Sequence, residues 1–390
     1  MSEKLRAGII GSGNISTSYL RLAPLFHGVE IVSCADIDMA AAEAQAGKFN
    51  IGAVSVDEML STDDIDIVVN LTIPAAHFEV SSQVLAAGKH VYSEKPFVLS
   101  VEEGMKLAAL AKEKNRRIGS APDTFFGGSH QLARHLIDSG VVGKVTSGTC
   151  HVMSHGMEHW HPNPDFFFKP GGGPILDLGP YYITNLVQLL GPARRVSAVS
   201  STPASERVIS SQPRAGERIP VETPTTIHSI MEFASGAVVT LGASWDVWDN
   251  RHSHMELYGE TGSLYLPDPN FFGGEVECVT SSGGPADIPD WDHPFSQPNQ
   301  EHSSGSMANY RAAGLADMAL AIIEGRPHRC SGDLALHVVD IMTSILMSGE
   351  QGQFVTLRTT CERPAAFGIE EARGLLAAAP EGMFKGADVA

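Results

Sequence analysis

The first third of the chain alternates short apolar runs with amphipathic segments, and this alternation limits the possible folds more than any other feature. Five runs have the length of buried strands: 5–11, 30–36, 65–71, 90–93 and 117–121. Helical patterns lie between them at 14–26, 38–49, 75–88 and 100–115. Parallel strands are joined by helices in right-handed crossovers, so the pattern predicts an α/β fold with a doubly wound parallel sheet.

The pattern changes after a helix expected at 128–139. Longer β-like stretches follow at 143–155, 193–201, 225–233, 236–244, 253–259 and 262–267, several of them next to turn signals. They predict an α+β domain on a large, mostly antiparallel open sheet, completed by helices at 305–325 and 331–349. Stretches rich in Pro, Gly and Ser at 201–224 and 267–304 are expected to be surface excursions. The predicted domains are residues 1–124 and 125–390.

Composition excludes several kinds of partner. The formal net charge of −18 favours a surface that repels nucleic acid and anionic lipid. No apolar run reaches the ~18 residues of a membrane span, and the first residues do not have the pattern of a signal peptide. The five cysteines are scattered and form no C-x-x-C pair, which favours free thiols in a reducing compartment. We expect a cytoplasmic protein.

A glycine-rich turn after the first strand predicts a dinucleotide site. In GIIGSGNIS, Gly11 and Gly13 allow a tight turn and let the backbone approach a pyrophosphate at the start of the next helix. Ser16 stands at the third glycine's position in this fingerprint, and a turn without any ligand is the alternative. Asp36, at the end of the second strand, can accept hydrogen bonds from ribose hydroxyls. No arginine follows it closely, so the expected cofactor is NAD rather than NADP.

An acid and a phenol stand four residues apart in GGGPILDLGPYY, at the start of a predicted helix at 179–190. This spacing puts Asp177 and Tyr181 on one helix face. In one interpretation Asp177 caps the helix and Tyr181 packs in the core. In the other they form a proton-handling pair beside a ligand that the glycine-rich backbone can approach closely. Lys95 in YSEKP is either a solvated loop lysine or a side chain that points into the ligand crevice of the parallel sheet.

Three segments together resemble the glucose-fructose oxidoreductase/inositol dehydrogenase (Gfo/Idh/MocA) family: TIPAAH (72–77), EKP (94–96) and GGGPILDLGPYY. The resemblance covers nearly the whole chain. It implies an N-terminal Rossmann domain that binds NAD and a C-terminal domain that binds substrate and forms homo-oligomers, dimers or tetramers, through its open sheet. The residues then expected to contact the cofactor are Gly11, Gly13, Asn14, Ile15, Asp36, Ile37, Thr72, Pro74, His77, Glu94 and Lys95.

The same resemblance implies the catalytic residues. In the family the EKP lysine, here Lys95, lies near the nicotinamide and the substrate hydroxyl. Many members read D-x-G-x-H-x-x-D with histidine as the acid/base, whereas this chain has Tyr181 and Thr184 at those positions, as in a tyrosine-bearing branch. Free tyrosine has a pKa of ~10, and a nearby lysine cation lowers that value. We therefore expect Tyr181 to accept the proton and Asp177 to orient the substrate or balance Lys95. Lys95 as the base is the alternative.

The segment HGMEHWH (155–161) contains the H-x-x-E-H pattern of zinc proteases. That chemistry needs a helix, which the neighbouring prolines and glycines forbid, so no metal is expected. A plain surface loop is one interpretation. The other is a polar and aromatic lip of the substrate pocket, formed by His155, His159, Trp160 and His161. Neutral imidazoles and an indole suit a hydroxyl-rich, uncharged ligand.

These features predict an NAD-dependent sugar dehydrogenase. The tyrosine-bearing relatives suggest oxidation of an aldose at C1 to a lactone. Alternatives are oxidation of a ring secondary alcohol of a cyclitol or glycoside, or reduction of a ketosugar. The family also contains NAD-binding transcriptional regulators, but a pure sensor has no need of the proton relay that Lys95, Asp177 and Tyr181 would form.

Overall fold

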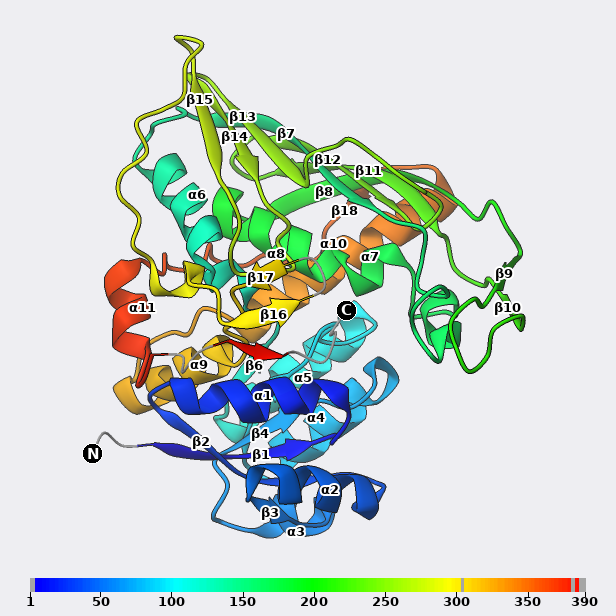
Figure 1. Ribbon diagram of the computed structural model, residues 1–390, viewed down its shortest axis with the longest axis vertical. Coiled ribbons are helices and arrows are strands. Elements are labelled where there is room, and N and C mark those ends of the chain that lie inside the picture. Colours follow the sequence, from blue (N-terminus) through cyan, green and yellow to red (C-terminus); the bar gives the residue numbers. More distant parts are fainter. Residues whose placement is uncertain (1–3, 303–304, 380–382, 386–390) are drawn as a thin grey trace.

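The computed structural model describes residues 4–302, 305–379 and 383–385. Two sheets lie one above the other in Figure 1. The lower sheet has six parallel strands in the order β3-β2-β1-β4-β5-β6. Its strands are β1 (Leu5–Ile10), β2 (Val29–Ala35), β3 (Gly52–Ala53), β4 (Ile67–Asn70), β5 (His90–Ser93) and β6 (Ile118–Ser120). The predicted doubly wound parallel sheet is confirmed.

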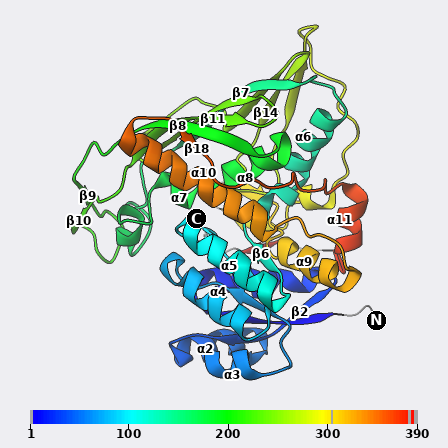
Figure 2. The ribbon, with the colours of Figure 1, turned by 180° about the vertical axis from the view of Figure 1, so that it is seen from behind.

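Helices cover both faces of this sheet. α1 lies over one face in Figure 1, and Figure 2 shows α4 and α5 over the other. The helices are α1 (Asn14–Leu22), α2 (Met39–Phe49), α3 (Val56–Ser61), α4 (His77–Ala86) and α5 (Val101–Lys114), and the 3-10 turns η1 (Ala23–Leu25) and η2 (Pro74–Ala76) adjoin α1 and α4. The Ser100 hydroxyl caps α5, and Asn115 ends it in the left-handed conformation. Such local signals explain why most predicted boundaries lie within a few residues of the observed ones.

The upper sheet has eight strands in the order β15-β14-β13-β7-β12-β11-β8-β18. All neighbouring strands are antiparallel except β12 and β7, so the mostly antiparallel second domain is also confirmed. The strands are β7 (Val145–Met153), β8 (Ala193–Ser201), β11 (Thr226–Phe233), β12 (Val238–Ser244), β13 (Met255–Gly259), β14 (Gly262–Leu266), β15 (Glu277–Thr280) and β18 (Val355–Thr356).

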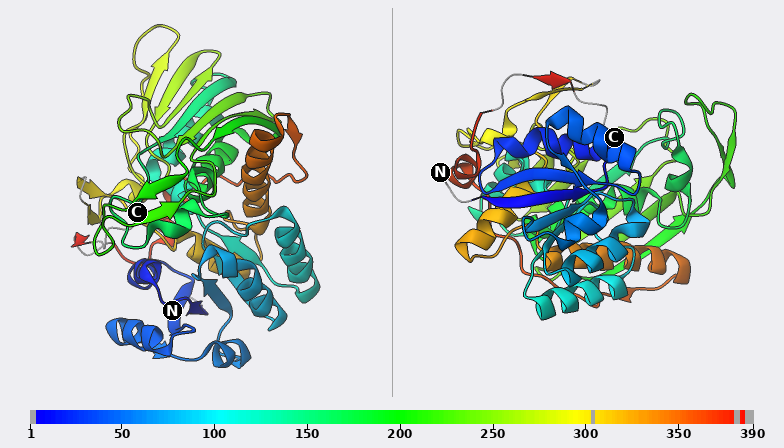
Figure 3. Two further views of the ribbon diagram at one scale, coloured as in Figure 1. Left: turned by 90° about the vertical axis from the view of Figure 1, so that its right-hand side faces the viewer. Right: turned by 90° about the horizontal axis from the view of Figure 1, so that it is seen from below.

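One face of the upper sheet is packed and the other is open. The packed face lies on α6 (Gly128–Asp138), α7 (Pro174–Asp177), α8 (Gly179–Leu190) and α10 (Gly332–Gln351). Figures 1 and 3 show no described segment over the opposite face. Buried and exposed residues alternate along β11 because only one face of the sheet is packed. Ile227, Met231 and Phe233 are buried, while His228 and Ile230 are exposed.

Segments near the C-terminus return to the lower sheet. α9 (Ala313–Glu324) packs against β2 and β6, and α11 (Ile369–Leu375) packs against α9. Residues 305–307 form a strand, so the helix predicted at 305–325 begins eight residues later. The remaining elements are η3 (Thr124–Phe126), η4 (Pro164–Phe168), β9 (Glu206–Val208), β10 (Arg218–Pro220), η5 (Pro294–Ser296), β16 (Gln300–His302), β17 (Gly305–Met307) and β19 (Phe384–Lys385).

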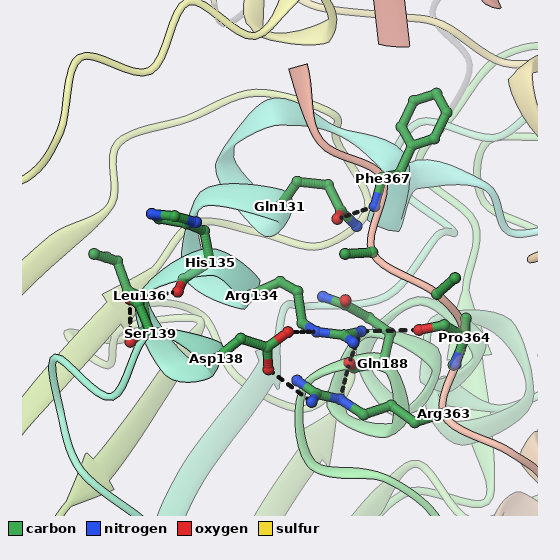
Figure 4. A network of polar contacts seen from close by, with 12 residues as sticks. Gln131, Arg134, His135, Leu136, Asp138, Ser139, Gln188, Arg363, Pro364 and Phe367 are labelled. Atoms are coloured by element: carbon green, nitrogen blue, oxygen red, sulfur yellow. Dashed lines mark hydrogen bonds and ion pairs between the residues drawn. The ribbon is translucent and has the colours of Figure 1, made fainter. Parts of the chain in front are cut away.

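A partly buried polar network ties the segment after β18 to α6 and α8 (Figure 4). Arg134 donates to the carbonyls of Gln188 and Pro364 at 2.8 and 2.9 Å and to the Asp138 carboxylate at 2.5 Å. Arg363 donates to the same Gln188 carbonyl and, at 2.7 Å, to Asp138. These bonds satisfy the Gln188 carbonyl near the end of α8, the helix that carries Tyr181.

Candidate active site

Four of the expected site segments meet at one edge of the lower sheet. Gly11, Asp36, Thr72 and Glu94 follow β1, β2, β4 and β5, and the strands are parallel, so all four lie at their carboxyl ends. The strand order reverses between β1 and β4, which is where open α/β sheets form their ligand crevice.

The turn after β1 has the geometry of a dinucleotide cradle. Gly11 has φ +104°, and a Cβ atom there would lie 2.6 Å from the Leu71 carbonyl. Gly13 precedes α1 with open space around it, and no side chain caps this helix, so its first N–H groups can receive a phosphate. Ser16 is fully buried and donates to the Gly13 carbonyl at 2.6 Å, which stabilises the turn in the third glycine's place.

Asp36 is positioned by backbone groups rather than by a basic side chain. Its two carboxylate oxygens accept from the N–H groups of Ser12 at 2.7 Å and Asp38 at 3.0 Å. The exposed side chains of Ile37 and Ile73 follow β2 and β4, on either side of β1. The residues present therefore fit a dinucleotide: a glycine turn, a helix N-terminus, a fixed carboxylate and two apolar side chains.

A cavity of about 270 Å³ adjoins this edge. The domain of the lower sheet supplies one part of its wall: Asn14, Ile15, Pro74, Lys95 and Pro96. The domain of the upper sheet supplies the rest: Trp160, His161, Phe166, Phe167, Gly171, Gly172, Leu176 and Asp177. The cavity thus lies between the cradle and the stretch that carries the predicted catalytic pair.

Lys95 and Asp177 form the charged centre of the cavity wall. Lys95 Nζ donates to the Asp177 carboxylate and to the Asp177 backbone carbonyl, both at 2.9 Å. Burial alone would lower the pKa of Lys95, but the charges and hydrogen bonds of Asp177 and other neighbours raise it above its usual value. Lys95 is therefore a fixed cation at neutral pH.

Tyr181 adjoins Lys95 but is not among the residues that line the cavity. Lys95 Nζ is 5.2 Å from the centroid of the Tyr181 ring, and 7% of the tyrosine surface is exposed. Burial acts to lower the pKa of Arg311, but interaction with Tyr181, Glu94 and Asp123 raises it overall. Sequence reasoning missed Arg311, which lies far away in the chain. The structure thus brings Lys95, Asp177 and Tyr181 together and adds a second cation.

Other predicted cofactor residues take supporting positions. His77 is buried, and its ring nitrogens lie 2.7 Å from the Pro96 carbonyl and 2.9 Å from the Thr72 carbonyl, so it ties together the loops after β4 and β5. Glu94 accepts from the Lys95 backbone N–H and from the Tyr19 hydroxyl, each at 2.9 Å. Both residues hold the loop that presents Lys95.

The predicted lip divides into two parts. Trp160 and His161 line the cavity together with Phe166 and Phe167, which sequence reasoning missed. His155 instead stacks on Trp248, and His159 is exposed outside the described cavity wall. Nearby Glu158, the acid of the H-x-x-E-H pattern, is buried and accepts from Arg207 at 3.1 Å.

Comparison with known families agrees with this geometry. The pattern of the oxidoreductase family with an NAD-binding Rossmann fold matches residues 5–121, and that of the GFO/IDH/MocA C-terminal domain matches residues 130–265. The chain belongs to the Gfo/Idh/MocA oxidoreductase family. Its cofactor is NAD, as the glycine turn and Asp36 predict.

Individual relatives of this Gfo/Idh/MocA protein are distant. An uncharacterized oxidoreductase of Schizosaccharomyces pombe is 34% identical over 37% of this chain and 38% of its own length. Levoglucosan dehydrogenase of Pseudarthrobacter phenanthrenivorans is 26% identical over 67% of this chain and 73% of its own length. A solved levoglucosan dehydrogenase in complex with NADH has a TM-score of 0.77 at 21% identity, covering 92% of this chain and 100% of that one. No helix within the described residues is long and apolar enough to cross a membrane.

Proposed function

We propose that this protein oxidises a hydroxyl group of a neutral sugar, with an aldose C1 hydroxyl as the leading candidate. The observation that carries the proposal is the Lys95–Asp177 pair with Tyr181 beside Lys95. The pair lies at a cavity whose wall is part dinucleotide cradle and part aromatic lip. Bound NAD supplies the acceptor for the hydride. The chain's own residues must then bind the sugar and remove its hydroxyl proton.

Tyr181 is the proposed proton acceptor. Lys95 is a poor base because its raised pKa keeps the ammonium protonated. It serves better as a fixed charge that orients the substrate hydroxyl. Asp177 holds this ammonium through two oxygen atoms and lines the cavity, so it also orients the substrate.

The cavity wall favours an uncharged, hydroxyl-rich ligand. Trp160, Phe166 and Phe167 offer ring faces and edges, which pack well against the C–H surfaces of a sugar ring. His161 adds a polar ring whose pKa burial lowers, so it is neutral at physiological pH. Lys95 already pairs with Asp177, and a phosphate or carboxylate group on the substrate would have to compete for it.

A panel of substrates tests this proposal. Aldoses, cyclitols, glycosides and levoglucosan are each offered with NAD, and NADH absorbance is followed. We expect turnover with at least one neutral sugar, and product analysis then distinguishes a lactone from a ring ketone. Binding of NAD and sugar without any turnover would instead favour a sensor of the regulator type.

Tyr181→Phe tests the proton acceptor. The change keeps the ring and removes the hydroxyl, so kcat should fall by ~10² or more while NAD affinity is retained. Tyr182→Phe is the matched control, because the Tyr182 hydroxyl bonds His254 at 2.9 Å, whereas the Tyr181 ring adjoins Lys95. If Tyr181→Phe mainly raises KM and leaves kcat within about tenfold, Tyr181 only donates a hydrogen bond.

A further inference from the structure

The His161 ring lies among aromatic rings in the part of the cavity wall that belongs to the domain of the upper sheet. Trp160, Phe166 and Phe167 each meet the imidazole edge-on, with ring centroids 5.3, 5.4 and 5.3 Å from it and interplanar angles of 80°, 81° and 83°. Aromatic rings favour this edge-to-face geometry. Contacts on three rings leave the imidazole little freedom to turn, so it presents one fixed edge to the cavity.

The backbone at His161 is anchored by the excursion that contains β9 and β10. The Ser211 hydroxyl donates to the His161 carbonyl at 2.6 Å, and the His161 N–H donates to the Met157 carbonyl at 2.9 Å. Arg214 pairs with Asp165 through two hydrogen bonds, which tie η4, the turn that carries both phenylalanines, to the same excursion. The histidine and its aromatic neighbours are thus held together before any ligand binds.

A backbone hydrogen bond determines which ring nitrogen of His161 carries the proton. The Asn163 N–H donates to His161 Nδ1 at 3.0 Å. Because a backbone N–H can only donate, Nδ1 must offer its lone pair, and the proton of the neutral ring then lies on Nε2. Burial lowers the pKa of His161, although Asn163 and Asp177 act in the opposite direction. At neutral pH the ring therefore has its N–H at Nε2.

This Nε2–H group is open to a ligand. No group of the described residues bonds His161 Nε2, and this atom is not among the buried polar atoms that lack a partner. The ring is partly buried and lines the cavity, so Nε2 is a donor that solvent or a bound molecule can reach. Across the same cavity, Lys95 and Asp177 provide the polar groups of the proposed reaction.

We propose that His161 determines substrate specificity by donating a hydrogen bond from Nε2–H to a second oxygen of the sugar, apart from the hydroxyl that reacts beside Lys95. The inference deepens the proposed function and rests on it, because it assumes a sugar in this cavity. A hydroxyl, a ring oxygen or a glycosidic oxygen can accept this bond. An amino group at the same place is protonated at neutral pH and cannot, so amino sugars should be rejected.

Nuclear magnetic resonance tests the first step without any sugar. The protein is labelled with ¹⁵N in its histidines, and the signals of His161 are identified by their loss in His161→Phe. We expect the chemical shifts of a neutral ring with its proton on Nε2. A neutral ring with its proton on Nδ1, or a ring that is cationic at neutral pH, overturns the inference.

Sugar binding to the protein–NADH complex, measured by calorimetry, tests the second step without turnover. The probe is the panel sugar with the highest affinity. His161→Phe keeps an aromatic ring and removes the donor, so Kd should rise about tenfold or more while NADH affinity is retained. His161→Gln can place an amide N–H near the position of Nε2 and should recover part of the loss. His159→Phe is the matched control, because His159 is exposed outside the described cavity wall, and its Kd should stay within about twofold.

Analogues of this sugar that lack one oxygen at a time, the ring oxygen included, identify the accepting atom. At one position the loss should weaken binding to the wild type about tenfold and change little in His161→Phe, since the two changes remove the same bond. With the intact sugar, His161→Phe should raise KM and keep kcat within about tenfold.

The outcomes separate this inference from the proposed function. Equal sugar affinity of His161→Phe and the wild type overturns the inference even if turnover is normal. Sugar binding that depends on His161 but leads to no turnover overturns the proposed function and leaves the inference standing. Absence of binding by every sugar overturns both.

Discussion

Two regions combine basic side chains with an acid and use them for different purposes. In the network of Figure 4, Arg134 and Arg363 share Asp138, and their other bonds go to backbone carbonyls. In the active site, Lys95 pairs with Asp177 and lies 5.2 Å from the centroid of the Tyr181 ring. In the first arrangement the charges pair with one another and with backbone carbonyls, so they stabilise the fold. In the second, the Lys95 ammonium lies near Tyr181, a group that can exchange a proton.

This comparison predicts that the largest loss of turnover will come from a substitution at Lys95. Lys95→Ala removes a charge that lines the cavity and whose hydrogen bonds go to Asp177 within the site. Turnover should fall by ~10⁴-fold or to background, at the upper end of what one acid/base group contributes, because Tyr181 also loses its neighbouring cation. The melting temperature and the NAD affinity measured by calorimetry should stay close to those of the wild type. A variant within a few-fold of wild-type kcat would contradict the role.

Arg134→Met should lower the stability of the fold but leave turnover nearly unchanged, which is the opposite of the result expected for Lys95→Ala. The arginine side chain is 10% exposed, and its loss leaves the carbonyls of Gln188 and Pro364 without this donor. We expect a loss of about 2–4 kcal/mol in the free energy of unfolding, measured with denaturant, and kcat within about threefold of wild type. A large fall in kcat with unchanged stability would show that the network serves the chemistry.

The pH dependence of stability should follow from the same network. Burial acts to raise the pKa of Asp138, but hydrogen bonds from Arg134 and Arg363 lower it below its usual value overall. A depressed folded-state pKa contributes stability above the unfolded-state pKa, and this contribution is lost as the pH falls through the folded-state value. Arg134→Met should therefore lose less stability than the wild type on acidification.

Sequence reasoning found the parts of the site that local patterns determine. Gly11, Asp36 and Lys95 follow strands whose periodicity is clear, so their meeting at one sheet edge could be predicted. Asp177 belongs to the other domain, and its place beside Lys95 was implied by the family resemblance. The six-residue helix α3 was missed, although the capping box from Ser55 to Glu58 is a readable signal for its start.

Long-range features could not be predicted in this way. Arg311 lies inside a stretch predicted as helix, and alanine at position 312 gives no sign of a left-handed conformation. His155 and His159 are neighbours of Trp160 in sequence, but their side chains lie elsewhere because the segment turns. Their placement depends on Trp248 and on the excursion that contains β9 and β10.

A second cluster of two arginines and an acid lies on the open face of the upper sheet. Glu232 on β11 pairs with Arg194 at 2.8 Å and Arg195 at 2.7 Å, both more than half exposed. Solvent weakens such pairs, so they contribute little despite good geometry. The same face exposes apolar side chains, including Val199 at 75% and Ile230 at 44%. We propose that these side chains form the contact of a homo-oligomer.

The smallest predicted effect is therefore that of Glu232→Gln. It should leave the melting temperature within about 2 °C of the wild type and the mass from light scattering unchanged, since charge pairs at the rim of a contact matter little. Ile230→Glu, two residues away on the same face of β11, places a charge among the apolar side chains and should yield monomers that retain their fold. A wild-type mass of one protomer at micromolar concentration would refute the contact. A large loss from Glu232→Gln would instead place its ion pairs inside a buried interface, where removing one partner is costly because it leaves an uncompensated charge.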